Sequence, residues 1–183
     1  MLSREILILN YILLVGIHGV GKTTLLNNLK NDTQFTALSI SDLIRQAGNK
    51  IQSNNKLTKN IANNQELWKQ ELATYQFQED EIVILDGHFT LLDSSGKIFE
   101  LPYSTFEGLK INKIILKTEN PSIIQNRLVK RDGKHWDTEL LSSFQAREQS
   151  RATEFSQLEN ISLFIYDNDS KLEDLKNFFF DVD

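Results

Sequence analysis

The segment VGIHGVGKTT, residues 15–24, constrains the fold of this 183-residue chain more than any other. Gly16, four residues and then Gly21-Lys22-Thr23 match the pattern G-x(4)-G-K-[ST] of a phosphate-binding loop. The glycines let successive backbone N–H groups point at phosphate oxygens, and the N-terminus of a helix follows. In such loops the lysine reaches the β- and γ-phosphates and the hydroxyl holds Mg²⁺. We therefore predict that ATP and Mg²⁺ are bound here, with ATP contacted by Gly16, His18, Gly19, Val20, Gly21, Lys22, Thr23 and Thr24.

Apolar runs alternate with helical patterns along the chain, which predicts an α/β fold with a parallel sheet and helices on both faces. The runs lack a two-residue alternation, as is typical of strands buried on both faces. Expected strands lie at 11–16, 35–40, 81–86, 112–117 and 162–167, and expected helices at 22–30, 41–47, 57–78, 121–131, 138–159 and 170–180. We expect one domain over residues 1–183, a three-layer P-loop fold with a five-stranded parallel sheet.

Composition excludes several classes of protein. The formal net charge of -5 argues against a general nucleic-acid binder, which normally shows a basic face. The chain has no cysteine, so disulfides and thiolate-bound zinc are excluded, and its 3 histidines offer little material for a metal site. The apolar run from Ile6 to Val15 is shorter than the ~20 residues needed to span a bilayer. We expect no membrane contact, a cytoplasmic location with the nucleotide pool, and a protein partner or homodimer contact through Leu2–Leu9.

An acidic residue, Asp86, ends the apolar run IVILDGHF. In P-loop proteins an aspartate at the end of a buried strand holds Mg²⁺, so Thr23 and Asp86 are the expected metal-binding residues. The alternative is that Asp86 only caps the turn that follows, since Asp-Gly is a common turn pair. His88 has two interpretations of equal weight: it donates a hydrogen bond to a phosphate or acceptor, or it fills a pocket wall.

Four segments, GIHGVGKTT, SDLIR, LDGHFT and RLVKR, occur in the order found in one known family. With DSSGKIFELP at residues 93–102, the chain resembles the adenylate kinase-like nucleoside monophosphate kinases, and within them the archaeal-type adenylate kinases and their nuclear relatives. The likeness runs from about residue 11 to the C-terminus. It implies a small acceptor-binding lobe at 41–80 and a short lid at 127–140. The Asn-rich stretch 47–65 is either a lobe that closes over a ligand or a solvated helix pair, and composition alone favours the helix pair.

The resemblance also implies roles for particular residues. Asp42 and Arg45 match the D-x-x-R helix start that grips the acceptor, and Asp86 and Gly87 match the pair that lies between the two nucleotides. Acceptor contacts are therefore expected from Asp42, Arg45, Gly87 and His88. The chain departs from the bacterial-type motif, which continues with Pro-Arg where this sequence has His88-Phe89.

Arginines form the second implied set. Arg127 and Arg131 are four residues apart, so they share one face of a helix, and they resemble the lid pair that contacts the adenine and the phosphates of ATP. Taken alone, the two arginines are better explained as a solvated basic helix end, but their place after the fourth strand and an Asn-Pro helix start favours the lid. A later arginine, Arg147 or Arg151, is expected to reach the transferred phosphoryl group. The expected catalytic residues are Lys22, Arg127, Arg131 and Arg147.

These expectations favour ATP- and Mg²⁺-dependent phosphoryl transfer to a nucleoside monophosphate, with AMP as the first acceptor. A different class of function stays open, namely a regulatory or assembly ATPase that acts on a protein or ribonucleoprotein partner. A P-loop kinase of a non-nucleotide substrate is the third alternative.

Overall fold

The computed structural model describes residues 10–52, 61–78, 80–92, 95–133 and 135–181. The predicted contact through Leu2–Leu9 and part of the 47–65 stretch lie outside these residues.

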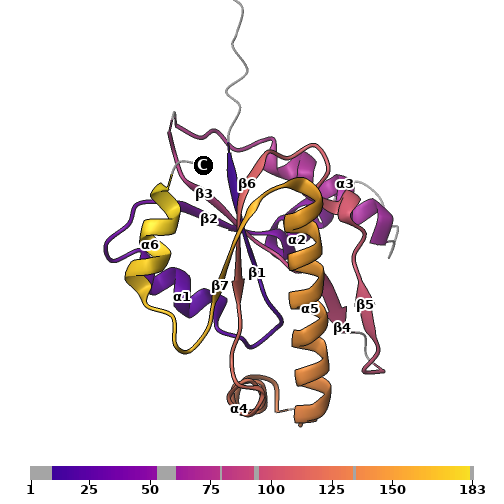
Figure 1. Cartoon of the computed structure of the whole chain (residues 1–183). Coiled ribbons are helices and arrows are strands. Elements are labelled where there is room, and N and C mark those ends of the chain that lie inside the picture. Colours follow the sequence, from indigo (N-terminus) through magenta and orange to yellow (C-terminus); the bar gives the residue numbers. More distant parts are fainter. Residues whose placement is uncertain (1–9, 53–60, 79, 93–94, 134, 182–183) are drawn as a thin grey trace, which may run out of the picture.

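Five parallel strands form the central sheet, in the order β2-β3-β1-β6-β7 (Figure 1). The strands are β1 (Tyr11–Val15), β2 (Thr36–Ser39), β3 (Val83–Asp86), β6 (Ile111–Lys117) and β7 (Ser162–Tyr166). All four neighbouring pairs are parallel, so consecutive strands of the sheet are joined by long crossover connections and not by tight turns. The predicted α/β fold with a five-stranded parallel sheet is confirmed.

Helices cover both faces of this sheet. Figure 1 shows α1 (Lys22–Leu29) and α6 (Leu172–Phe180) on one side, and α2 (Ile40–Gln52), α3 (Ile61–Leu72) and α5 (Thr138–Glu159) on the other, with α4 (Pro121–Asp132) at one end. Side chains of β1 alternate between the two layers: Ile12 and Leu14 pack with α1 and α6, whereas Leu13 and Val15 pack with α2, α3 and α5. The sheet is therefore buried on both faces, which explains its unbroken apolar runs.

The structure differs from the local predictions in three places. The helix expected at 57–78 ends at Leu72 in the structure, because Tyr75 and Phe77 stack at 6.1 Å and pack on the core from a non-helical segment. The helix expected at 41–47 extends to Gln52.

The third difference is a hairpin that the sequence did not suggest, β4 (Thr90–Leu92) with β5 (Ile98–Glu100), followed by the short helix η1 (Tyr103–Phe106). Strands of three residues show too few alternations to stand out as a pattern.

A third apolar cluster joins α4, α5 and the hairpin beneath the phosphate loop. Ile17 and Val20 of the loop pack there with Ile124, Leu128, Leu141 and Phe144, and Trp136 lies against them. The stretch predicted as a lid, 127–140, thus contains the end of α4, a short turn and the start of α5, and Trp136 ties it to the loop. In the described part of the chain, no helix is both long enough and apolar enough to cross a membrane.

Candidate nucleotide-binding site

The phosphate loop connects β1 to α1, and its glycines adopt backbone conformations that other residues avoid. Gly16 has φ 145° and Gly21 has φ 102°. A Cβ at Gly16 would lie 2.6 Å from the carbonyl oxygen of Lys117, and a Cβ at Gly21 would lie 3.0 Å from Nη1 of Arg127. Gly21 is also the N-cap of α1 and offers no side-chain cap, so the first N–H groups of the helix have no capping acceptor from that residue. This arrangement suits an anion.

Lys22 lies across this loop. Its Nζ donates to the carbonyl oxygen of Gly16 at 2.5 Å and lies 3.4 Å from Oδ1 of Asp86. Burial lowers the pKa of Lys22, and the nearby carboxylates of Asp86 and Glu148 act in the opposite direction. The lysine is therefore a buried cation held between the loop and the end of β3.

Asp86 reaches the loop because β3 lies between β2 and β1, and its Cα is in register with Leu14 and Ser39. Burial raises the pKa of Asp86, and the charge of Lys22 partly offsets that increase.

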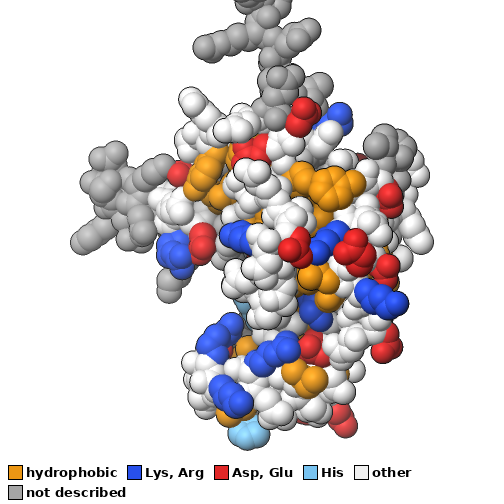
Figure 2. All heavy atoms as spheres, turned by 90° about the vertical axis from the view of Figure 1, so that its left-hand side faces the viewer, with side chains coloured by type: hydrophobic (Ala, Val, Ile, Leu, Met, Phe, Trp, Pro, Cys, Tyr) orange, Lys and Arg blue, Asp and Glu red, His pale blue; other side chains and the backbone are white. Residues whose placement is uncertain are grey.

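A cavity of about 350 Å³ opens beside the loop. Figure 2 shows the molecule hollowed on one face, with Lys and Arg side chains gathered on the lower part, where α4 and the start of α5 lie in Figure 1. The cavity is lined by Ile17, His18, Gly19, Gly21, Lys22, Thr23, Ser39, Ser41, Asp86, His88, Arg127, Leu128 and Arg131. Three of the predicted ATP-binding residues do not line the cavity: Gly16, Val20, which is buried in the apolar cluster, and Thr24, which is exposed on α1.

Two histidines meet inside this cavity. The rings of His18 and His88 have centroids 4.5 Å apart, and Nδ1 of His88 lies 2.8 Å from the carbonyl oxygen of Gly16 and 3.3 Å from Nζ of Lys22. Burial and the charge of Lys22 hold the pKa of His88 well below its usual range. Nδ1 of His88 can either donate to the carbonyl of Gly16 or accept from Lys22, according to the tautomer of the ring, but it cannot do both.

Both predicted lid arginines face the loop. Nη1 of Arg127 donates to the carbonyl oxygen of Val20 at 3.0 Å, while Nη2 lies 3.0 Å from Glu119. Arg131 lines the cavity and pairs with its neighbour Asp132 at 2.7 Å. Arg127 thus binds the loop backbone, and Arg131 lines the cavity together with Lys22 and Arg127.

The predicted acceptor residues are split. His88 lines the cavity, and Gly87 packs so closely on α2 that a Cβ there would lie 2.8 Å from Cδ1 of Ile40. Asp42 and Arg45 pair with each other at 2.5 Å on the exposed surface of α2 and do not line the cavity.

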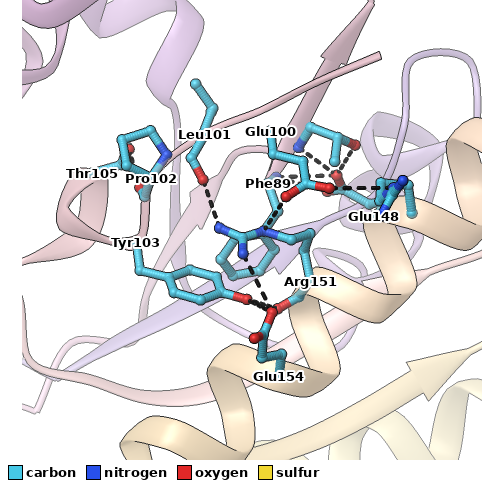
Figure 3. Close-up of polar contacts among 11 residues, drawn as sticks. Phe89, Glu100, Leu101, Pro102, Tyr103, Thr105, Glu148, Arg151 and Glu154 are labelled. Atoms are coloured by element: carbon cyan, nitrogen blue, oxygen red, sulfur yellow. Dashed lines mark hydrogen bonds and ion pairs between the residues drawn. The ribbon is translucent and has the colours of Figure 1, made fainter.

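Arg147 and Arg151 are not brought to the loop. Figure 3 shows Arg151 between Glu100, the carbonyl of Leu101 and Glu154, with its guanidinium 3.6 Å from the centre of the Tyr103 ring. Arg147 pairs with the same Glu100 at 3.2 Å. Since Glu100 belongs to β5, these two arginines attach the hairpin to α5, and neither lines the cavity.

The sequence analysis missed Ser39 and Ser41 of the cavity lining and one buried residue that supports the site. Glu148 of α5 is 0% exposed, and its carboxylate accepts hydrogen bonds from the loop and from the segment after β3. No motif contains it, and a glutamate within a long polar helix looks like a surface residue. The only sequence signal would have been its place on the face of α5 shared with Leu141, Phe144 and Ala152.

The site fits a magnesium nucleotide. The part of the chain that the structure covers holds no group of three or more His, Cys, Asp or Glu side chains arranged to bind a metal. Mg²⁺ does not need one, because it is usually held by one or two protein oxygens together with phosphates and water. The hydroxyl of Thr23 and the carboxylate of Asp86 both line the cavity and supply such oxygens.

Fold and loop together define the class: a P-loop protein with a three-layer α/β fold. A family model described as an AAA domain matches residues 15–145, and the chain belongs to that family. No curated protein matches the chain.

Among solved structures, a shikimate kinase from Bacteroides thetaiotaomicron matches over 92% of this chain and 97% of its own, with 17% identity and a TM-score of 0.54. This match supports the fold. A gluconokinase from Sinorhizobium meliloti 1021 matches over 92% and 87%, with 15% identity and a TM-score of 0.45. TT1252 from Thermus thermophilus matches over 93% and 94%, with 15% identity and a TM-score of 0.46. The closer resemblance to adenylate kinases stays a prediction.

Proposed function

We propose that the chain transfers the γ-phosphoryl group of ATP, with Mg²⁺, to a small acceptor. The observation that carries this proposal is the extent of the cavity. It runs from Lys22 and Thr23 at the loop, past Asp86, to Ser39 and Ser41 at the end of β2 and the start of α2. A triphosphate on the loop would fill the first part, and the remaining part leaves room for a second molecule beside its terminal phosphate.

The cations of the site suit the charge that develops during transfer. Phosphoryl transfer spreads negative charge over the equatorial oxygens and needs positioning and electrostatic stabilisation more than covalent chemistry. In this proposal Lys22 and Arg131 stabilise that charge, and Arg127 fixes the loop. Mg²⁺, held by Thr23 and Asp86, would neutralise the phosphates of ATP.

The acceptor we propose is a nucleoside monophosphate, with AMP first, on the resemblance given above. Arg45 is the proposed phosphate-binding group, and in this structure its guanidinium forms an ion pair with Asp42. An incoming phosphate would replace this exposed carboxylate at the start of α2. No carboxylate base is needed on this route, because the acceptor is already an anion.

A coupled assay of ADP formation tests the proposal. The acceptors are AMP, the other nucleoside monophosphates, and shikimate and gluconate as non-nucleotide acceptors. We expect the rate with AMP to exceed the rate without an acceptor by at least ~10-fold. ADP formation that no acceptor increases would contradict kinase activity and leave hydrolysis of ATP, while a response only to shikimate or gluconate would contradict the nucleotide acceptor.

Arg45→Ala tests the acceptor site. We expect the KM for AMP to rise by ~10-fold or more, while the KM for ATP changes by less than about twofold, since one charged hydrogen bond is worth about 1.5–3 kcal/mol. Lys171→Ala is the matched control, because Lys171 precedes α6 and is not part of the cavity lining. Equal increases in the two KM values would show that Arg45 does not bind the acceptor specifically.

A further inference from the structure

A fully buried carboxylate connects the two sides of the site. Glu148 lies on α5, 132 residues beyond Gly16 in the chain. Its Oε1 accepts from the N–H of Gly16 at 3.2 Å and from the N–H of Phe89 at 3.0 Å. Its Oε2 accepts from the N–H of Thr90 at 2.7 Å and also from the Thr90 hydroxyl. Figure 3 shows Glu148 reaching from α5 toward Phe89.

We propose that Glu148 is a positioning residue that sets the separation between the phosphate loop and the chain that leaves β3. This inference rests on the proposed phosphoryl transfer, because it concerns the alignment of its two sides. The loop would hold the donor ATP, whereas Asp86 and His88, just before Phe89, face the metal and the acceptor. One side chain that binds both segments fixes the space between them.

The chemistry of the contacts requires a carboxylate. Four donors converge on two oxygens, and an ionised carboxylate can accept all four because it offers about four lone-pair sites. A glutamine amide in its place would point its own NH₂ group, which is a donor, toward these N–H donors. Part of the four hydrogen bonds would then be lost. Burial raises the pKa of Glu148, while the bonds from Thr90 and Phe89 and the nearby charge of Lys22 lower it.

The effect of Glu148 passes through Gly16 to the reacting groups. Glu148 holds the N–H of Gly16, and the carbonyl of the same residue accepts from Lys22 and contacts His88. A shift of Gly16 would therefore displace a contact of the Lys22 ammonium and a contact of the His88 ring together. Lys22 and His88 therefore both depend on the position of the Gly16 carbonyl group.

Other parts of the loop have their own supports. Arg127 holds the carbonyls of Gly19 and Val20, and Val20 packs in the apolar cluster with Leu128. The amides of the loop that precede α1 therefore keep their shape without Glu148. Loss of its carboxylate should disturb alignment for transfer much more than binding of the nucleotide.

Glu148→Gln tests this inference, with Mg²⁺ and a non-hydrolysable ATP analogue in calorimetry and steady-state kinetics beside it. We expect the Kd of the analogue to change by less than about threefold while kcat falls by about 10²-fold, the usual cost of a 1 Å misplacement. Glu148→Asp keeps the charge but is shorter, so it should recover part of kcat. Thr90→Val removes one of the four donors and should lower kcat less than Glu148→Gln.

Glu159→Gln is the matched control, the same change on the exposed end of α5, and should leave kcat and Kd unchanged. A Glu148→Gln protein with unchanged kcat would overturn the inference. A protein in which kcat and analogue affinity fall by the same factor would also overturn it, because Glu148 would then only support the fold of the loop.

Amide hydrogen exchange separates failure of this inference from failure of the proposed function. If the wild-type chain transfers phosphate to no acceptor, kinetics cannot report alignment, but exchange still can. We expect Glu148→Gln to speed exchange at Gly16, Phe89 and Thr90 and to leave Leu13 and Leu85 protected. Faster exchange throughout β1 and β3, or no change at the three amides, would overturn the positioning role.

Discussion

Lys22 is bound from three directions in the candidate site. Its ammonium contacts the carbonyl of Gly16, the carboxylate of Asp86 and the ring of His88. These contacts hold a buried cation where the terminal phosphates of a nucleotide would lie. A nucleotide would take over part of this coordination, since phosphate oxygens are stronger acceptors for a cation than a backbone carbonyl.

Lys22→Met is expected to reduce kcat by ~10³-fold or more and to keep the fold, because methionine fills the same volume without the charge. The measurement is the rate of ADP formation, with circular dichroism as the check on folding. Lys30→Met, at the exposed end of α1, is the control. A folded Lys22→Met protein with normal turnover would exclude phosphoryl transfer at this loop.

Arg131→Ala is expected to lower kcat by at least ~10²-fold, since an arginine on the transferred group is worth 10³–10⁵ in comparable enzymes. Lys130→Ala is the matched control, because Lys130 is its exposed neighbour and does not line the cavity. A decrease of less than about threefold would mean that Arg131 only forms its surface pair with Asp132.

Individual site residues were predictable where a short motif holds them. Lys22, Thr23 and Asp86 follow from the loop pattern and from one strand end, and the structure brings all three to one cavity. Glu148 and the Arg151–Glu100 pair were not predictable, because each depends on a contact between distant parts of the chain. A buried glutamate has no local signature, since its partners are backbone amides that every residue possesses.

Helix α4 carries both arginines predicted for the lid, and its start at Pro121 agrees with the helix expected at 121–131. The side chain of Asn120 accepts from the N–H of Ser122 at 2.9 Å, and the helix ends at Gly133 in the left-handed conformation. Residues at or next to each end of α4 therefore explain where this helix begins and ends. No comparable local sequence signal marks the β4–β5 hairpin, because Glu100 attaches it to α5 through contacts between distant parts of the chain.

Asn120→Ala is expected to lower the free energy of unfolding by about 1 kcal/mol, the usual cost of losing an N-cap. Urea unfolding measures it. Asn126→Ala on the exposed face of the same helix is the control and should raise stability slightly, because alanine is the better helix former. Equal losses in the two variants would show that Asn120 does not act as a cap.

The whole chain folds around a sheet whose order places β1, with the phosphate loop, between β3 and β6. Ligand binding at the loop should therefore stabilise the entire fold. With MgATP at 100 times its Kd, the free energy of unfolding should rise by about 2.7 kcal/mol. Thermal unfolding measures the shift, chelation of Mg²⁺ should reduce it, and Lys22→Met should lose most of it. An unchanged midpoint would contradict nucleotide binding.

The architecture was predictable because parallel strands leave unbroken apolar runs and their crossovers leave helical patterns. The elements that were predicted incorrectly are short, or their bounds depend on packing, as at the end of α3 near Tyr75.

Glu148 lies just beyond residue 145, where the match to the family model stops. An excised piece ending at that boundary would retain the complete glycine-lysine motif. It would also leave the N–H groups of Gly16, Phe89 and Thr90 without their acceptor. The same cut would remove most of α5 together with β7 and α6. Cutting the chain at the boundary of the family model would therefore remove the glutamate that binds Gly16 of the phosphate loop.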